Sequence, residues 1–140
     1  MFIEDKDTID FSIYYKKVLK DRRLYIAYTE SEFKLLPEEE QKGCDTLSLK
    51  MKELTWGMYN DLQEEAMADT NGSGDRQFNF KIYKENRLLT LLSGWSAKDK
   101  DDKPVPINNK AVSHLSPTIA ETILRAYDEV SFVTEEKEKN

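Results

Sequence analysis

Cysteine and histidine are almost absent from this sequence, which has one of each among its 140 residues, Cys44 and His114. A single cysteine excludes a disulfide within the chain and a cysteine-based metal cluster. A single histidine without a recognisable partner motif gives little support for a general base. We therefore interpret His114 as a polar residue at an element boundary, ahead of a helix cap. Cys44, which follows Gly43, is interpreted as a semi-buried structural thiol, because nothing indicates positively charged surroundings.

Long apolar runs are also absent. No stretch approaches the roughly 18 apolar residues that a membrane-spanning helix needs. Residues 1–7 carry acid where a signal peptide would need positive charge and an apolar run. We therefore expect a cytosolic protein that makes no membrane contact.

Basic residues are fewer than acidic ones, 21 against 27, which leaves a net charge of −6. This balance argues against binding to the phosphate backbone of nucleic acids, which needs clustered lysine and arginine. It favours solubility and a basic partner surface, and an acidic mimic of nucleic acid is conceivable. With 39% apolar and 11% aromatic residues, the chain can still form a core of one-domain size.

Motifs for metal or phosphate binding are incomplete. Asp99, Asp101 and Asp102 suggest a calcium loop, but lysines interrupt them, Pro104 replaces the glycine at the sixth position and the closing glutamate is missing. The glycines of segment 72–74 are not followed by the G-K-[ST] ending of a phosphate loop. The acidic runs at 38–40 and 64–65 are interpreted as solvated helix faces. The sequence therefore predicts no catalytic, cofactor-binding or metal-binding residue, and no enzyme.

Alternating apolar residues predict strands in the first third of the chain. Segment 8–19 places four such residues on one face: Ile9, Phe11, Ile13 and Tyr15. After a polar turn at Lys20-Asp21-Arg22, the alternation resumes, and we predict an antiparallel hairpin over 8–29. A short helix is expected after Pro37, and a third strand over 46–51.

Apolar spacings of three and four residues predict helices in the rest of the chain. Thr55 is a plausible cap for a helix with an apolar face formed by Trp56, Tyr59, Leu62 and Ala66. A turn-rich loop at 69–75 precedes a second helix over 77–93, whose first residues could instead form a strand. A charged loop at 96–108 leads to a short helix over 109–115. The last helix is capped at Ser116-Pro117 and runs to about residue 132.

Both tryptophans, Trp56 and Trp95, fall within segment 54–95, which holds much of the apolar material and forms the centre of the chain. Tryptophan is enriched at binding hot spots. Because each of the two continues a helical apolar stripe, core packing is the favoured interpretation. The loops at 69–76 and 96–107 and the acidic tail are then the better candidates for interaction.

Three segments carry a resemblance to a known family: L-T-W-G-M-Y-N-D-L-Q-E-E-A at 54–66, F-N-F-K-I-Y-K-E-N-R-L-L at 78–89 and W-S-A-K-D-K-D-D-K-P-V-P-I at 95–107. They resemble the tail assembly chaperones and neighbouring tail-module proteins of tailed bacteriophages. The shared features are an L-T-W-G-x-Y-N helix start, a leucine-rich helix ending in tryptophan, a loop of the D-x-x-G-x-P type and a closing helix. The resemblance covers residues 54–130. The chain departs from the family in its strand-rich first third and in Asp102-Lys103, where a glycine is expected.

The resemblance implies a non-enzymatic role in tail assembly within the host cytoplasm. The implied partner is another phage protein of the tape-measure or tail-tube type, and a homo-oligomer stays open. One alternative is a structural virion subunit of the neck, tail or capsid, with the N-terminal hairpin adding strands to a neighbour's sheet. A more distant alternative is an acidic inhibitor that mimics nucleic acid.

These observations together predict an α+β fold. We expect an N-terminal antiparallel sheet of about three strands followed by three or four helices. Residues 1–53 form the β-rich region, and residues 54–132 form a helical region packed on it as one domain. Residues 133–140 have no apolar content and are expected to be a disordered acidic tail.

Overall fold

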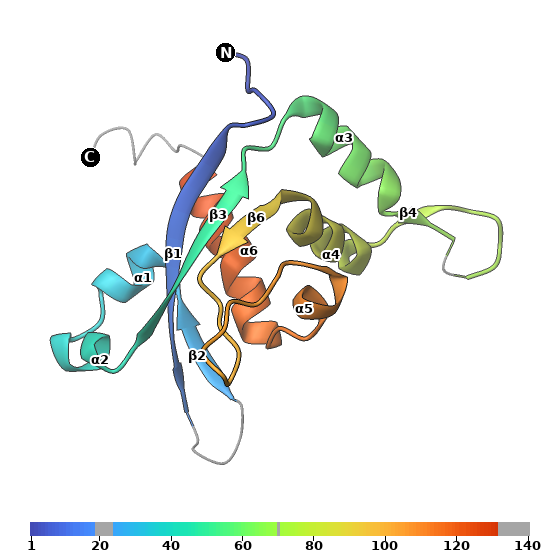
Figure 1. Cartoon of the computed structure of the whole chain (residues 1–140). Helices are drawn as coiled ribbons and strands as arrows, with labels where there is room; N and C mark the ends of the chain where they lie inside the picture. Colours follow the sequence, from blue (N-terminus) through green and yellow to red (C-terminus); the bar gives the residue numbers. More distant parts are fainter. Residues whose placement is uncertain (19–23, 70, 132–140) are drawn as a thin grey trace.

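A four-stranded antiparallel sheet with the order β2-β1-β3-β6 is the centre of the fold in the computed structural model, which describes residues 1–18, 24–69 and 71–131 (Figure 1). The strands are β1 (Thr8–Lys17), β2 (Tyr25–Tyr28), β3 (Asp45–Lys52) and β6 (Leu92–Trp95). Six helices accompany them within the described residues: α1 (Glu30–Lys34), α2 (Glu38–Lys42), α3 (Trp56–Glu65), α4 (Phe80–Leu91), α5 (Asn109–Ser113) and α6 (Pro117–Ser131). The predicted α+β class is confirmed.

The predicted hairpin forms between β1 and β2, with Tyr14 opposite Tyr28 and Lys17 opposite Tyr25. Its turn at Lys20-Asp21-Arg22 lies outside the described residues, as does the acidic tail at 133–140. The third strand, β3, pairs with β1 from Thr8 opposite Lys52 to Tyr15 opposite Asp45. Because side chains alternate across a strand, this register places the apolar residues of both strands on the same face of the sheet.

The fourth strand was not predicted, because residues 92–93 were assigned to the end of a helix. The helix α4 instead ends at Leu91, and Leu92 adopts an extended conformation that leads into β6. Two features next to β3 explain why these residues form a strand. The Ser93 hydroxyl donates to the Lys50 carbonyl at 3.1 Å, and a Cβ added at Gly94 would lie 3.4 Å from the Lys50 Cβ. A glycine therefore allows the close approach of the two strands.

The second helix also begins later than predicted, at Phe80 and not at residue 77. Gln77–Phe78 form a two-residue strand, β5, that pairs with β4 (Met67–Ala68). Asn79 then caps α4 by accepting a hydrogen bond from the Ile82 amide at 3.1 Å. The β4–β5 hairpin projects from the rest of the structure beyond the end of α3 (Figure 1).

The core lies between the apolar face of the sheet and α6, which runs behind the sheet in Figure 1. Ile13 and Met51 from the sheet and Ile123 from α6 are fully buried. The other members are Phe11, Ala27, Leu47, Leu49, Leu88, Leu91, Leu92, Val112, Ile119, Leu124, Ala126 and Tyr127. Residues from both the N-terminal and C-terminal regions therefore share one core.

Tyr127 of α6 ties the helix to the end of β3. Its hydroxyl donates to the Lys52 carbonyl at 2.9 Å and accepts from the Leu54 amide at 3.0 Å. Burial raises the pKa of Tyr127, so the hydroxyl stays protonated and can donate. Arg87 of α4 lies over the tyrosine ring, 5.3 Å from its centroid, and pairs with Asp128.

A polar network joins α1 to α6. Thr29 and Glu32 form a reciprocal capping box at the start of α1. Glu129 accepts hydrogen bonds from Thr29 and Ser31, at 3.2 and 3.0 Å, and Arg125 donates to Glu32 at 2.8 Å. Partial burial opposes ionisation of Glu32, but the hydrogen bonds from Arg125 and the Thr29 amide outweigh it and lower the pKa of this carboxyl.

Replacing Tyr127 with phenylalanine removes both hydrogen bonds at the end of β3 while keeping the buried ring. Because the Leu54 amide and Lys52 carbonyl lose their partner, the free energy of unfolding is expected to fall by about 1–3 kcal/mol. Urea denaturation at pH 7 measures this change. Tyr59→Phe is the control, since the hydroxyl of Tyr59 makes no hydrogen bond within the described residues. Equal stability of the two variants would contradict the role of Tyr127.

Replacing Glu32 with glutamine tests the network on α1. A carboxyl with a lowered pKa in the folded state stabilises the fold above its unfolded-state pKa, and this stabilisation is lost as the pH falls through the folded-state pKa. E32Q is therefore expected to lower the free energy of unfolding by about 0.5–1 kcal/mol at pH 7, and to match the wild type at pH 3. Urea denaturation at both pH values checks this. E39Q, at an exposed glutamate of α2, should change little at either pH.

Candidate functional site

His114 and Cys44, the residues considered for catalysis, each contact the backbone carbonyl that lies four residues earlier in the chain. His114 is exposed at the end of α5, and its Nδ1 donates to the Lys110 carbonyl at 2.7 Å. Cys44 is half-buried, with its Sγ 3.4 Å from the Glu40 carbonyl. Within the described part of the chain, no three His, Cys, Asp or Glu side chains are placed to hold a metal ion.

The aspartates of segment 99–102 fold a turn. The Asp99 carboxylate accepts from the Asp101 amide at 2.8 Å and from the Lys103 amide at 3.0 Å. Asp102 pairs with Lys98 at 3.6 Å and has a positive φ of 61°. The carboxylates of Asp99 and Asp102 therefore stabilise the turn itself. The segment is an exposed charged loop, as the sequence predicted.

The predicted loop at 69–76 joins the two short strands of the projecting hairpin. Gly72 and Gly74 have φ values of 68° and 84°, in the left-handed region that favours glycine. The Asp69 carboxylate accepts from the Gly74 amide at 2.8 Å. Arg76 donates to the Glu64 carboxylate and to the Met67 carbonyl, each at 3.2 Å, so it fastens the hairpin to the end of α3.

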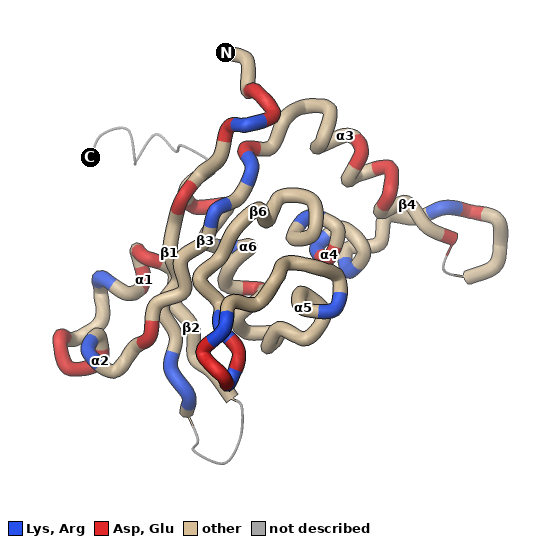
Figure 2. Tube along the Cα trace, in the orientation of Figure 1, with Lys and Arg blue, Asp and Glu red and all other residues tan. Residues whose placement is uncertain are grey.

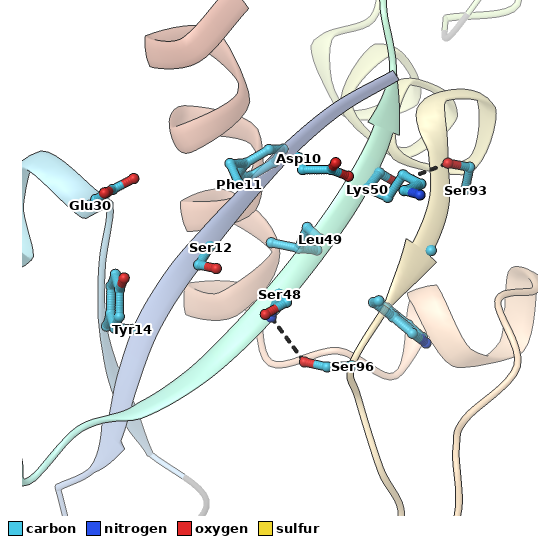
Figure 3. A pocket seen from close by; sticks show the side chains of 12 residues that line it. Asp10, Phe11, Ser12, Tyr14, Glu30, Ser48, Leu49, Lys50, Ser93 and Ser96 are labelled. Carbon is cyan, nitrogen blue, oxygen red and sulfur yellow. Dashed lines mark hydrogen bonds between the residues drawn. The ribbon is translucent and has the colours of Figure 1, made fainter. Parts of the chain in front are cut away.

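A shallow polar hollow of about 790 Å³ covers the open face of the sheet (Figure 3). Asp10 and Lys50 are opposite one another on β1 and β3, as are Ser12 and Ser48. The Ser48 amide donates to the Ser96 hydroxyl at 2.9 Å. Polar residues on one face are typical of an antiparallel sheet that packs its other face on a core. Neither cysteine nor histidine is among the lining residues.

A second, more apolar groove of about 550 Å³ lies between α4, α5 and the start of α6. Leu89, Val112 and Leu115 are among its lining residues. The Lys84 ammonium and Glu121 carboxylate, 2.6 Å apart, join α4 to α6 beside it. The rim carries both signs of charge, so the groove does not indicate the chemistry of a ligand.

Three aromatic rings gather where the projecting hairpin meets α4. We call Phe78, Phe80 and Tyr83 the aromatic cluster; their ring centroids are 5.4 to 6.2 Å apart. Phe80 is 66% exposed and Phe78 is 41% exposed. Phe78 therefore does not lie on a buried face of the helix that was predicted over 77–93. It lies in the short strand β5, which among the described residues pairs only with β4.

Trp56 also contradicts its prediction, because it is 76% exposed and stacks on Tyr59 at a centroid distance of 5.7 Å. It occupies the first residue of α3, a helix that buries only Leu62. The helical spacing was correct, and the Thr55 cap is confirmed by a 3.1 Å hydrogen bond from the Met58 amide. Trp95 is half-buried against the core and donates to the Val105 carbonyl at 2.7 Å, as core packing predicted.

The exposed aromatic side chains Trp56, Phe78 and Phe80 lie inside segment 54–95, whereas the sequence placed the interaction candidates in the loops at 69–76 and 96–107 and in the acidic tail. A usable signal was present, since Phe78 and Phe80 alternate as in a strand and cannot share one face of a helix. Comparison with protein-family models, curated proteins and solved structures found no match for the chain. Among the described residues, no helix has the length and apolar content needed to cross a membrane.

Proposed function

We propose that this chain is a non-enzymatic protein that binds another protein during assembly of a bacteriophage tail, and that the aromatic cluster is the contact. The main support for this proposal is that three rings in mutual contact lie at the surface, with two of them exposed. Clustered exposed apolar side chains mark interaction sites on soluble proteins. The cluster lies in segment 78–89, one of the three segments that resemble tail assembly chaperones.

The geometry of the cluster suits a partner that presents apolar side chains. Each ring can bury a large area without losing many rotamers, because the neighbouring rings already restrict its orientation. Full burial of one such side chain is worth about 1.5–3 kcal/mol. A partner of the tape-measure type, with apolar stripes along a helix, would supply matching side chains.

An alternative role as a virion subunit is favoured by the exposed edge of the sheet at β2. Within the part of the chain that the structure describes, the edge strand β2 pairs only with β1, and its Ile26 is 38% exposed. An exposed edge strand can pair with a strand of a neighbouring subunit. Mass spectrometry of purified particles separates the two roles, since stoichiometric copies would favour the virion subunit.

Replacing Phe78 and Phe80 with alanine tests the aromatic cluster. The chain is co-expressed with a tape-measure protein, and retention of that protein is measured by pull-down at low salt. Loss of two rings is expected to weaken binding at least tenfold, because about 1.4 kcal/mol corresponds to a factor of ten in affinity. Both side chains are exposed, so the free energy of unfolding should change by less than about 1 kcal/mol.

Leu35→Ala is the matched control, since Leu35 is an apolar side chain that is 87% exposed and lies outside the cluster. It should retain the tape-measure protein as well as the wild type does. No retention by the wild type at low salt would contradict the proposed partner. Equal loss in the control would contradict the role of the cluster.

A further inference from the structure

The outward side of α3 has an unusual combination of residues. Its exposed positions, which we call the α3 outer face, are Trp56, Gly57, Asn60, Asp61, Glu64 and Glu65. On an α-helix, residues four apart lie one above the other, so Trp56, Asn60 and Glu64 form one row and Gly57, Asp61 and Glu65 form the next. Acidic positions follow one another along this helix in Figure 2.

The carboxylates lie where they oppose the helix dipole. The C-terminal end of a helix is electrically negative, and cations are the stabilising residues there. The last turn of α3 has no basic residue, while Glu64 and Glu65 lie in it. Arg76 pairs with Glu64 at 3.2 Å and the Asn86 amide donates to Glu65 at 3.3 Å, but Asp61 has no partner among the described residues. Among the described residues, the fold therefore gives Glu64 a cationic partner and Glu65 only a neutral donor, and it gives Asp61 no partner.

Gly57 is similarly unexplained by the fold. Glycine in a helix lowers stability through its backbone entropy, unless a close approach or a positive φ requires it. A Cβ added at Gly57 would meet only the Thr55 hydroxyl oxygen, at 4.0 Å, and its φ lies outside the positive range. The glycine therefore leaves open space beside the exposed Trp56 that the packing of the chain does not need.

We propose that the α3 outer face binds a lysine- and arginine-rich segment of the partner protein. The exposed indole of Trp56 stacks on a guanidinium group or a lysine stem, in the space that Gly57 leaves open. Asp61 and Glu65 pair with further basic side chains one helical turn apart. The face extends about 14 Å, because nine steps of 1.5 Å separate Trp56 from Glu65, and this length matches basic residues spaced over about three turns of a partner helix.

Charge complementarity selects this occupant. Arg76 donates to the Glu64 carboxylate and to the Glu64 backbone carbonyl, so it offsets one carboxylate and part of the negative helix end. The carboxylates of Asp61 and Glu65 still repel nucleic acid and attract cationic side chains. The two carboxylates without an ion pair, Asp61 and Glu65, give too few ligands for a metal site, which commonly needs four or more. This inference rests on the proposed protein-binding function and adds the chemistry of the partner.

Fluorescence anisotropy of the full chain with two labelled 18-residue amphipathic peptides tests the inference. One peptide carries lysine and arginine on its polar face, and the other carries glutamate at the same positions. The basic peptide is expected to bind and the acidic peptide is not. The variant D61N/E65Q should weaken binding of the basic peptide at least fivefold in 50 mM NaCl. W56A should weaken it at least threefold, and 300 mM NaCl should weaken the wild type more than D61N/E65Q.

The matched control is E39Q/E40Q, which removes the same charge from α2, another exposed acidic helix. It should change the affinity less than twofold. Absence of binding to the basic peptide, or an equal loss in the control, would overturn the α3 outer face as a specific site. Circular dichroism of each variant verifies that the fold is intact. An intact fold is expected because all the substituted side chains are exposed.

The same variants in the tape-measure pull-down separate the two proposals. If D61N/E65Q and W56A reduce retention along with the variants of the aromatic cluster, both proposals are supported. If the α3 variants retain the tape-measure protein and only the cluster variants lose it, the α3 inference is wrong and the proposed function stands. If the basic peptide binds but the wild type retains no tape-measure protein, the proposed function is wrong and the α3 site stands.

Discussion

The hydroxyl of Tyr127 donates to the Lys52 carbonyl and accepts from the Leu54 amide where α6 crosses the end of β3. These two bonds fix the helix that covers the sheet to the strand in its middle. They also fix the point where the chain leaves the sheet, because Thr55 caps α3 immediately afterwards. The same tyrosine therefore contacts both the end of β3 and the residue that precedes the α3 cap.

The elements of the fold contribute unequal numbers of apolar residues to the core. The sheet and α6 supply most of the core, whereas α3 buries only Leu62 within its length. The hairpin beyond α3 contains two strands of two residues each, too few to bury a face of its own. The aromatic residues of this part therefore have little apolar surface to pack against, and several stay at the surface.

Local chemistry was enough to predict much of the fold from the sequence. The alternation of Phe11 and Ile13 placed β1, that of Leu47, Leu49 and Met51 placed β3, and Thr55 placed the start of α3. The fourth strand needed long-range information, since the pairing of Gly94 with Lys50 joins residues far apart in the sequence. The exposure of Trp56 needed it as well, because helical spacing defines a face but cannot tell whether another element covers it.

The buried core and the proposed contact surfaces therefore use different side chains of one chain. A substitution in the sheet or α6 acts on a shared core and changes the whole fold. The side chains of the aromatic cluster and of the α3 outer face lie outside that core, although α4 itself adds Leu88 and Leu91 to it, so these exposed side chains can change without a large effect on folding. Trp56 is exposed and the space beside Gly57 is open, so neither residue adds much to the packing of this chain, and the proposed contact with a basic partner depends on both.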